Sequence, residues 1–202
     1  MRNGKKLAVA LAVCASALAG VRASAQNRDV TTAVGLDYRV VATTKTSTME
    51  REMNQAAESG FHFEAVMGGE TAFGGNEVVA VMSRPAGTSA GRFGYRLLAT
   101  NRTSTMEKEL REAAGAGFHY RGQTVFTTAF GGDEVVCILE RDGAAPNTRA
   151  DYKLVATSKT GTLEKELLQA GAAGYQVVGM TVGKTALGGS ELVAIMRRGP
   201  TQ

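Results

Sequence analysis

Hydrophobic and polar positions follow the same order three times along this chain. The registers 38–84, 95–141 and 152–198 align at a constant offset of 57 residues without a gap. Sixteen positions carry the same residue in all three copies. Self-similarity at a fixed period is the signature of a repeat architecture. The sequence therefore predicts three copies of one structural unit.

The first half of each unit predicts a strand followed by a helix. Residues 38–43 are rich in aromatic and β-branched side chains, which is typical of a strand. Ser47 precedes Glu50 by three residues, the pattern of a capping box, and Gly60 is expected to end the helix. The apolar residues between these signals fall on one helical face: Met49, Met53, Ala56 and Ala57; Met106, Leu110, Ala113 and Ala114; and Leu163, Leu167 and Ala170.

The second half of each unit predicts a β-hairpin. Polar and apolar residues alternate over 61–66, which indicates a strand with one buried face. A turn containing Gly74 and Gly75 leads into the nearly continuous apolar run 77–82, typical of a strand covered on both faces. The unit is therefore predicted to be strand–helix–strand–strand.

A single unit of this size needs support from its neighbours. A core this small rarely supplies more than about 3–5 kcal/mol without disulfides or a metal. We therefore predict an α+β fold of three tandem βαββ repeats packed together, with helices on one face of an antiparallel-rich sheet. The sequence leaves a pseudo-threefold and a side-by-side arrangement open.

The repeat boundaries divide the chain into seven segments. They are a signal peptide (1–25), a flexible arm (26–36), repeat 1 (37–84), a linker (85–94), repeat 2 (95–141), a linker (142–151) and repeat 3 (152–198). The linkers are rich in Gly, Ala, Ser and Pro and about ten residues long, which permits neighbouring repeats to dock.

The first 25 residues have the layout of a secretory signal peptide. A basic start precedes the apolar and small-residue run 7–20, and Ala23-Ser24-Ala25 offers a cleavage site after Ala25. The run is too short to span a bilayer of roughly 30 Å. We expect a secreted or periplasmic protein with no stable membrane span after cleavage. A short N-terminal anchor and a lipid-modified Cys14 are the alternatives.

Removing the leader changes the charge balance of the protein. The whole chain has 23 basic and 19 acidic residues, and the leader contains Arg2, Lys5, Lys6 and Arg22 and no acid. The mature chain therefore has 19 of each. A nucleic-acid-binding protein needs an excess of Lys and Arg against phosphates, so nucleic acid is not an expected partner.

Cysteine usage provides no disulfide framework. Cys14 leaves with the leader, so Cys137 has no partner in the mature chain. It aligns with Ala80 and Ala194, which favours a buried, inert thiol over a reactive or intermolecular one.

The third copy carries a recognisable pattern. Tyr152-Lys153-Leu154-Val155, followed by the run 167–178 (Leu-Leu-Gln-Ala-Gly-Ala-Ala-Gly-Tyr-Gln-Val-Val), resembles a small bacterial domain family of unknown function with the pattern YKVV … LNxxGxxGWELV. The chain departs from it where Phe61, Phe118 and Tyr175 replace the Trp. The resemblance implies a βαββ fold and a bacterial source. It implies no activity and offers no catalytic residues.

Two sets of shared charged residues are candidate binding groups. They are Glu77, Glu134 and Glu191 after the glycine turns, and Arg84, Arg141 and Arg198 at the ends of the third strands. A threefold arrangement would bring the three carboxylates together as a cation site. The alternatives are solvated glutamates at strand starts and arginines that blunt strand ends.

Other chemistry is not indicated by the sequence. His62 and His119 are too few for a transition-metal site and are expected to be exposed strand residues. No catalytic constellation, metal site or cofactor motif is evident. We therefore expect a non-enzymatic binding or structural module of the cell envelope, whose partner is an envelope protein or a small ligand. The alternatives are a small-molecule or ion-binding protein with a site between repeats, and an enzyme with one active copy.

Overall fold

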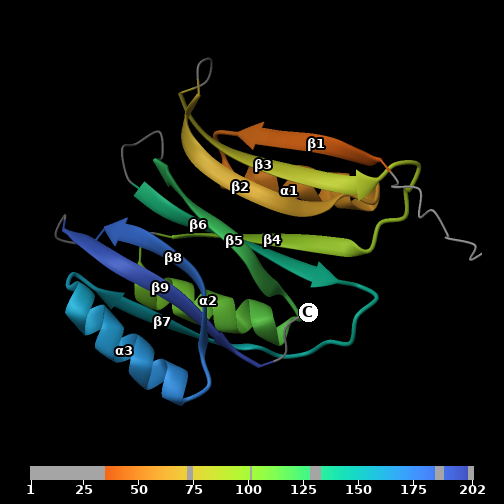
Figure 1. Ribbon diagram of the computed structural model, residues 1–202. Helices are drawn as coiled ribbons and strands as arrows, with labels where there is room; N and C mark the ends of the chain where they lie inside the picture. The colour runs from red at the N-terminus through yellow and green to blue at the C-terminus, as the bar shows by residue number, and fades with distance from the viewer. Residues whose placement is uncertain (1–34, 72–74, 101, 128–132, 185–188, 200–202) are drawn as a thin grey trace, which may run out of the picture. The chain divides into compact units, whose positions relative to one another are not determined.

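A computed structural model of the protein describes residues 35–71, 75–100, 102–127, 133–184 and 189–199. The predicted signal peptide and most of the predicted arm lie outside these residues. The elements, shown in Figure 1, are β1 (Leu36–Thr43), α1 (Thr46–Glu58), β2 (His62–Thr71), β3 (Gly75–Pro85), β4 (Phe93–Thr100), α2 (Thr103–Gly115), β5 (His119–Thr127), β6 (Asp133–Asp142), β7 (Asp151–Thr157), α3 (Thr160–Ala172), β8 (Gln176–Lys184) and β9 (Ser190–Arg198). This order confirms an α+β fold of three βαββ units. No helix in the described part is long and apolar enough to cross a membrane.

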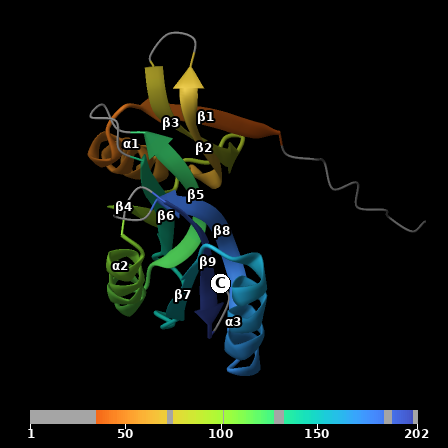
Figure 2. The same ribbon diagram turned by 90° about the vertical axis from the view of Figure 1, so that its left-hand side faces the viewer.

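Each repeat forms its own three-stranded antiparallel sheet. The strand orders are β1-β3-β2, β4-β6-β5 and β7-β9-β8, and can be followed in Figures 1 and 2. The apolar strand that closes each unit is therefore the central strand of its sheet. All three second strands carry an irregularity at the same place, between Phe63/Ala65, Tyr120/Gly122 and Val177/Gly179.

The helices begin differently from the sequence prediction. The N-cap residue of α1 is Lys45 rather than Ser47, and no side chain caps the helix. Instead, the Thr43 hydroxyl accepts a hydrogen bond from the Lys45 amide at 3.1 Å. Thr100 and Thr157 make the same contact at the starts of α2 and α3. The predicted capping box is therefore wrong, and Glu50 is left available for a longer-range contact.

The helix ends agree with the prediction. Gly60, Gly117 and Gly174 follow the helices with φ of 87°, 80° and 84°. The amide of the aromatic residue after each glycine bonds back into the helix, as Phe61 does to the Ala56 carbonyl at 3.2 Å. This left-handed geometry costs glycine little, which explains the shared residue.

The hydrophobic cores cross the repeat boundaries. The core around α1 contains Met49 and Met53, and it also contains Tyr95, Val136 and Ile138 from repeat 2. The core around α2 likewise includes Ala150, Tyr152 and Ile195 beyond repeat 2. The core around α3 draws only on repeat 3 and is smaller. Each of the first two helices is thus covered by the repeat that follows it.

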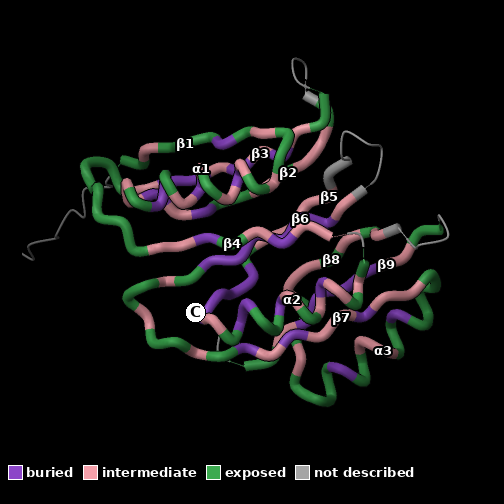
Figure 3. Tube along the Cα trace, turned by 180° about the vertical axis from the view of Figure 1, so that it is seen from behind, coloured by how far each residue is buried: buried purple, intermediate pink, exposed green. Residues whose placement is uncertain are grey.

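Burial along the central strands reflects these shared cores. In β6 all residues from Val135 to Glu140 are buried, whereas Val79 and Val81 of β3 are only half-buried. Figure 3 shows the contrast between the mostly buried β6 and the largely exposed β1. Cys137 is fully buried, as expected for an inert thiol.

Two matched leucine-to-alanine substitutions should measure how much one repeat is stabilised by packing against the next. Leu110 is 0% exposed in the core shared with repeat 3, while its counterpart Leu167 in α3 is only partly buried. We expect Leu110→Ala to lower the free energy of unfolding by about 2–5 kcal/mol. Leu167→Ala should cost clearly less. Urea unfolding of the two variants tests this, and equal losses would contradict a core completed by the following repeat.

Candidate functional site

Backbone hydrogen bonds to glutamates join each repeat to the next. The Leu97 amide donates to Glu50 Oε2 at 2.8 Å, and the Leu154 amide donates to Glu107 Oε2 at 2.9 Å. Donor and acceptor are 47 residues apart in both cases. Glu50 and Glu107 therefore belong to the junctions between repeats, rather than to capping boxes.

A buried tyrosine occupies the centre of each junction. The Tyr95 hydroxyl accepts a hydrogen bond from the Phe63 amide at 2.7 Å and donates to Glu140 Oε2 at 2.7 Å. Tyr152 repeats the first contact, because its hydroxyl accepts from the Tyr120 amide at 2.8 Å. Burial and the neighbouring Glu140 carboxylate raise the pKa of Tyr95 far above its usual value. Both hydroxyls therefore stay protonated over the physiological range.

A polar cavity lies where residues of all three repeats meet. Its volume is about 280 Å³, and it is lined by His62, Phe93, His119, Tyr120, Arg121, Glu140, Asp142 and Arg197. Within it, Arg121 Nε lies 3.4 Å from Glu140 Oε1, and Asp142 is bonded by Arg92. The Arg92 guanidinium lowers the pKa of Asp142. Charged side chains thus form half of the cavity lining, namely those of Arg121, Glu140, Asp142 and Arg197.

His119 is the least exposed polar group of this cavity. Only 3% of the residue is exposed, and neither ring nitrogen makes a hydrogen bond of good geometry to a described residue, although the Thr148 backbone interacts weakly with the ring. Burial lowers the pKa of His119, with a further contribution from the Arg197 charge, while the Thr148 backbone opposes the shift. The expectation of an exposed strand histidine was wrong at this position, because the neighbouring repeat covers it. His62 is only half-buried, with Nε2 3.4 Å from Glu64.

The three candidate glutamates lie in three different sheets. Glu77 pairs in register with Gly69, Glu134 with Phe126 and Glu191 with Gly183. Among the described residues, no group of three or more His, Cys, Asp and Glu is arranged to hold a metal ion. The cation site therefore stays a prediction for which the described geometry offers no ligand cluster.

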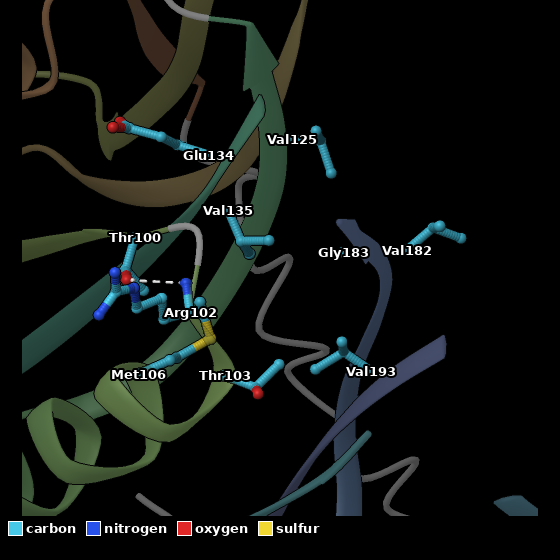
Figure 4. A pocket seen from close by; sticks show the side chains of 10 residues that line it. All are labelled: Thr100, Arg102, Thr103, Met106, Val125, Glu134, Val135, Val182, Gly183 and Val193. Atoms are coloured by element: carbon cyan, nitrogen blue, oxygen red, sulfur yellow. Dashed lines mark hydrogen bonds between the residues drawn. The ribbon is translucent and has the colours of Figure 1, made fainter. Parts of the chain in front are cut away.

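Glu134 borders a second, much smaller hollow. Its volume is about 20 Å³, and it is lined by Thr100, Arg102, Thr103, Met106, Val125, Glu134, Val135, Val182, Gly183 and Val193. Figure 4 shows the Glu134 carboxylate pointing away from Val182 and Val193. A hollow of this size holds about one water molecule. It is too small to enclose an organic ligand.

The three candidate arginines make contacts within their own repeats. Arg84 donates to the Ser59 carbonyl at the end of α1 at 2.7 Å, and its guanidinium lies 4.5 Å from the centre of the Phe61 ring. The other two make equivalent ring contacts: the guanidinium of Arg141 lies 4.9 Å from the centre of the Phe118 ring, and that of Arg198 lies 4.6 Å from the centre of the Tyr175 ring. These contacts stabilise the corner between each helix and the following strand.

The remaining cysteine shows no sign of reactivity. Cys137 is buried, its Sγ lies 3.8 Å from the sulfur of Met106, and burial raises the pKa of the thiol to about 12. Thiolate is the reactive form of cysteine, so this environment suppresses its chemistry.

Comparisons with known proteins found no matching family model, curated protein or solved structure. The resemblance of the third repeat to a small bacterial domain family remains a prediction based on the sequence.

The pKa of His119 has a consequence for stability that can be measured. Above pH 6.5 the ring is neutral in both folded and unfolded chains, so no stability is lost. As the pH falls below 6.5, the unfolded chain binds a proton that the folded chain disfavours. The free energy of unfolding should therefore fall, by at most about 1.4 kcal/mol per pH unit for this group.

The matched control is His119→Gln, since Gln176 holds this position in repeat 3. Urea unfolding of both proteins between pH 7.5 and 5 measures the difference in slope. If the free energy of unfolding depended on pH identically in both proteins, His119 would not resist protonation, despite its burial and the nearby charge of Arg197.

Proposed function

We propose that this chain is an exported, non-enzymatic binding and structural module of the bacterial cell envelope, with its repeats arranged side by side. The observation that carries the proposal is the position of the exposed large hydrophobic side chains. Four belong to strands β1 and β2 and form what we term the head face: Leu36, Tyr38, Val40 and Met67. Four belong to repeat 3 and form the tail face: Leu168, Val177, Met180 and Val182. None of the described residues of repeat 2 is among them.

Equivalent residues show that this exposure arises from a missing neighbour. Tyr38 is 63% exposed, whereas its counterparts Tyr95 and Tyr152 are 3% and 0% exposed. The side chain is the same at all three positions, so only the surroundings differ. Apolar groups gathered on a surface mark sites of protein interaction. The head and tail faces are therefore the binding surfaces of the module.

The shared polar residues also favour a structural role for the repeat. Glu50 and Glu107 hold neighbouring repeats together, and Arg84 and Arg198 bind the carbonyls at helix ends. These shared residues thus make contacts that either shape the single repeat or join it to the next one. Export to the envelope rests on the leader sequence and on the bacterial resemblance.

Photo-cross-linking tests the binding surfaces in living cells that produce the full chain. A photoreactive residue at Val40 or Met180 should give covalent adducts with protein, because both positions lie in the proposed binding faces. The same residue at Gln55, an exposed position on α1, is the control and should give none. Adducts that are absent at both faces, or equally abundant at Gln55, would contradict the proposal.

A second candidate function is the binding of a small anion in the polar cavity. It is favoured by the buried His119, whose ring nitrogens make no hydrogen bond of good geometry, and by Arg197, which lines the same cavity. Buried polar groups are normally hydrogen-bonded, so an unpartnered ring facing a cavity suggests a bound molecule. Inorganic phosphate and succinate are suitable probes for such a site.

Thermal unfolding with these probes tests the anion site. At 100-fold excess over Kd, a bound probe should stabilise the folded protein by about 2.7 kcal/mol. Arg197→Gln should abolish the rise in Tm, while Arg149→Gln, an exposed control outside the cavity, should retain it. A wild-type Tm that does not respond to either probe at constant ionic strength would exclude this candidate.

A further inference from the structure

The contacts that join successive repeats are used twice within one chain and are left open at both ends. At each junction, the first strand of one repeat packs on the helix of the preceding repeat. Tyr95 and Leu97 are thus held by α1, and Tyr152 and Leu154 by α2. The corresponding strand of repeat 1 is β1, with Tyr38 and Val40 at these positions. No described residue makes the equivalent contacts to β1.

Every residue of the head face has counterparts that lie at a junction. Tyr95 and Leu97 correspond to Tyr38 and Val40, and Phe93, which packs on the core around α1, corresponds to Leu36. The counterpart of Met67 is Thr124, whose hydroxyl lies beside Gly68 of the preceding repeat. The head face is therefore the same surface that repeats 2 and 3 bury.

Every residue of the tail face likewise has counterparts that contact the following repeat. Asn54 and Arg111, the counterparts of Leu168, bond the backbones of Tyr95 and Tyr152. The amides of Phe63 and Tyr120, the counterparts of Val177, bond the next tyrosine hydroxyl. The counterparts of Met180 and Val182 include Val66 and Gly68, which lie against Gly122 and Val125.

We propose that the head face of one copy docks on the tail face of a second copy. Repeat 1 of the first copy then packs on repeat 3 of the second copy in the way that repeat 2 packs on repeat 1 within a chain. This inference rests on the proposed function and names the partner as the chain itself. In this register Tyr38 packs where Tyr95 and Tyr152 pack in the other junctions. Its hydroxyl accepts from the Val177 amide, and Glu164, the counterpart of Glu50 and Glu107, accepts from the Val40 amide.

The sizes of two facing residues support this particular register. A Cβ atom on Gly122 would lie 3.2 Å from the Phe63 ring, and one on Gly179 would lie 2.2 Å from the Tyr120 hydroxyl. Both internal junctions therefore require glycine opposite an aromatic residue. The corresponding pair between copies is Ala65 opposite Val177. A larger residue in β2 meets a smaller one in β8, as a complementary fit requires.

One contact of the internal junctions changes at the boundary between copies. Leu168 replaces Asn54 and Arg111, so its position offers an apolar contact instead of a hydrogen bond to the backbone of Tyr38. This suits the apolar character of both faces. Because head and tail are different surfaces, the contact is heterologous, and repeated docking produces a chain of copies rather than a closed twofold dimer.

Mixing two blocked variants of the purified mature protein tests the proposal. Val40→Lys places a charge on the head face, and Met180→Lys places one on the tail face. Both side chains are more than half exposed, so the fold of each variant should persist, as a far-ultraviolet circular dichroism melt would show. Gln55→Lys is the control for an added charge on a surface away from both faces.

In sedimentation velocity experiments, wild type and Gln55→Lys should form oligomers whose sedimentation coefficient increases with protein concentration. Each blocked variant alone should stay monomeric. Their equimolar mixture should form dimers and nothing larger, because each variant retains one intact face. A monomeric wild type at all concentrations, or one blocked variant that still dimerises alone, would overturn head-to-tail docking.

Ala65→Phe tests the register itself. The added ring makes the exposed face more apolar, so non-specific association would increase, whereas docking in register would be blocked by Val177. Undiminished assembly of this variant would overturn the register. Deleting residues 26–34 tests whether this segment covers one of the two faces. If the protein assembles only after the deletion, the segment, and not a second copy, occupies the face in the intact chain.

The outcomes separate this inference from the proposed function. A monomeric purified protein that still gives cross-links from Val40 and Met180 to other proteins in cells would refute self-association and leave the binding module standing. An absence of adducts at both positions would remove both proposals.

Discussion

The packing of one repeat's first strand against the preceding repeat's helix is the interaction on which the rest of this structure depends. It buries Tyr95 and Tyr152, completes the cores around α1 and α2, and satisfies backbone amides that an edge strand would leave exposed. Because a unit this small has little core of its own, the free energy gained at the junctions stabilises the whole array. No described repeat covers helix α3, and this helix accordingly buries fewer residues than α1 and α2.

The same interaction explains where binding surfaces can arise. A repeat must present one face to its predecessor and another to its successor, so repeats 1 and 3 each retain one face that no described residue covers. In many repeat proteins terminal units become polar to avoid association. Here Tyr38 and Val40 remain apolar at one end, and Met180 and Val182 at the other. The polar cavity is a second product of the junctions, since it gathers His62, His119 and Arg197 from three repeats.

The local structure of each unit could be predicted well from the sequence. The hairpin that closes each unit, the helical faces and the glycine at φ of about 80–90° after each helix all follow from periodicity and residue type. The capping box was wrong because the Ser47 and Glu50 pattern is ambiguous: the same glutamate spacing also suits a contact with the Leu97 amide. The exposure of His119 was wrong because strand periodicity says nothing about a covering repeat.

The sequence by itself determined the number of units, their βαββ order and the residues on the buried face of each helix. These depend on interactions within a few residues or within one hairpin. Only the tertiary structure decided which identical residues are buried, since Tyr38, Tyr95 and Tyr152 share one local pattern and differ in their neighbours. It also decided that Arg84 and Arg198 bind the carbonyls at helix ends. The physical reason is that burial is a property of the contact between repeats, and the local pattern of one repeat does not show which of its faces a neighbouring repeat covers.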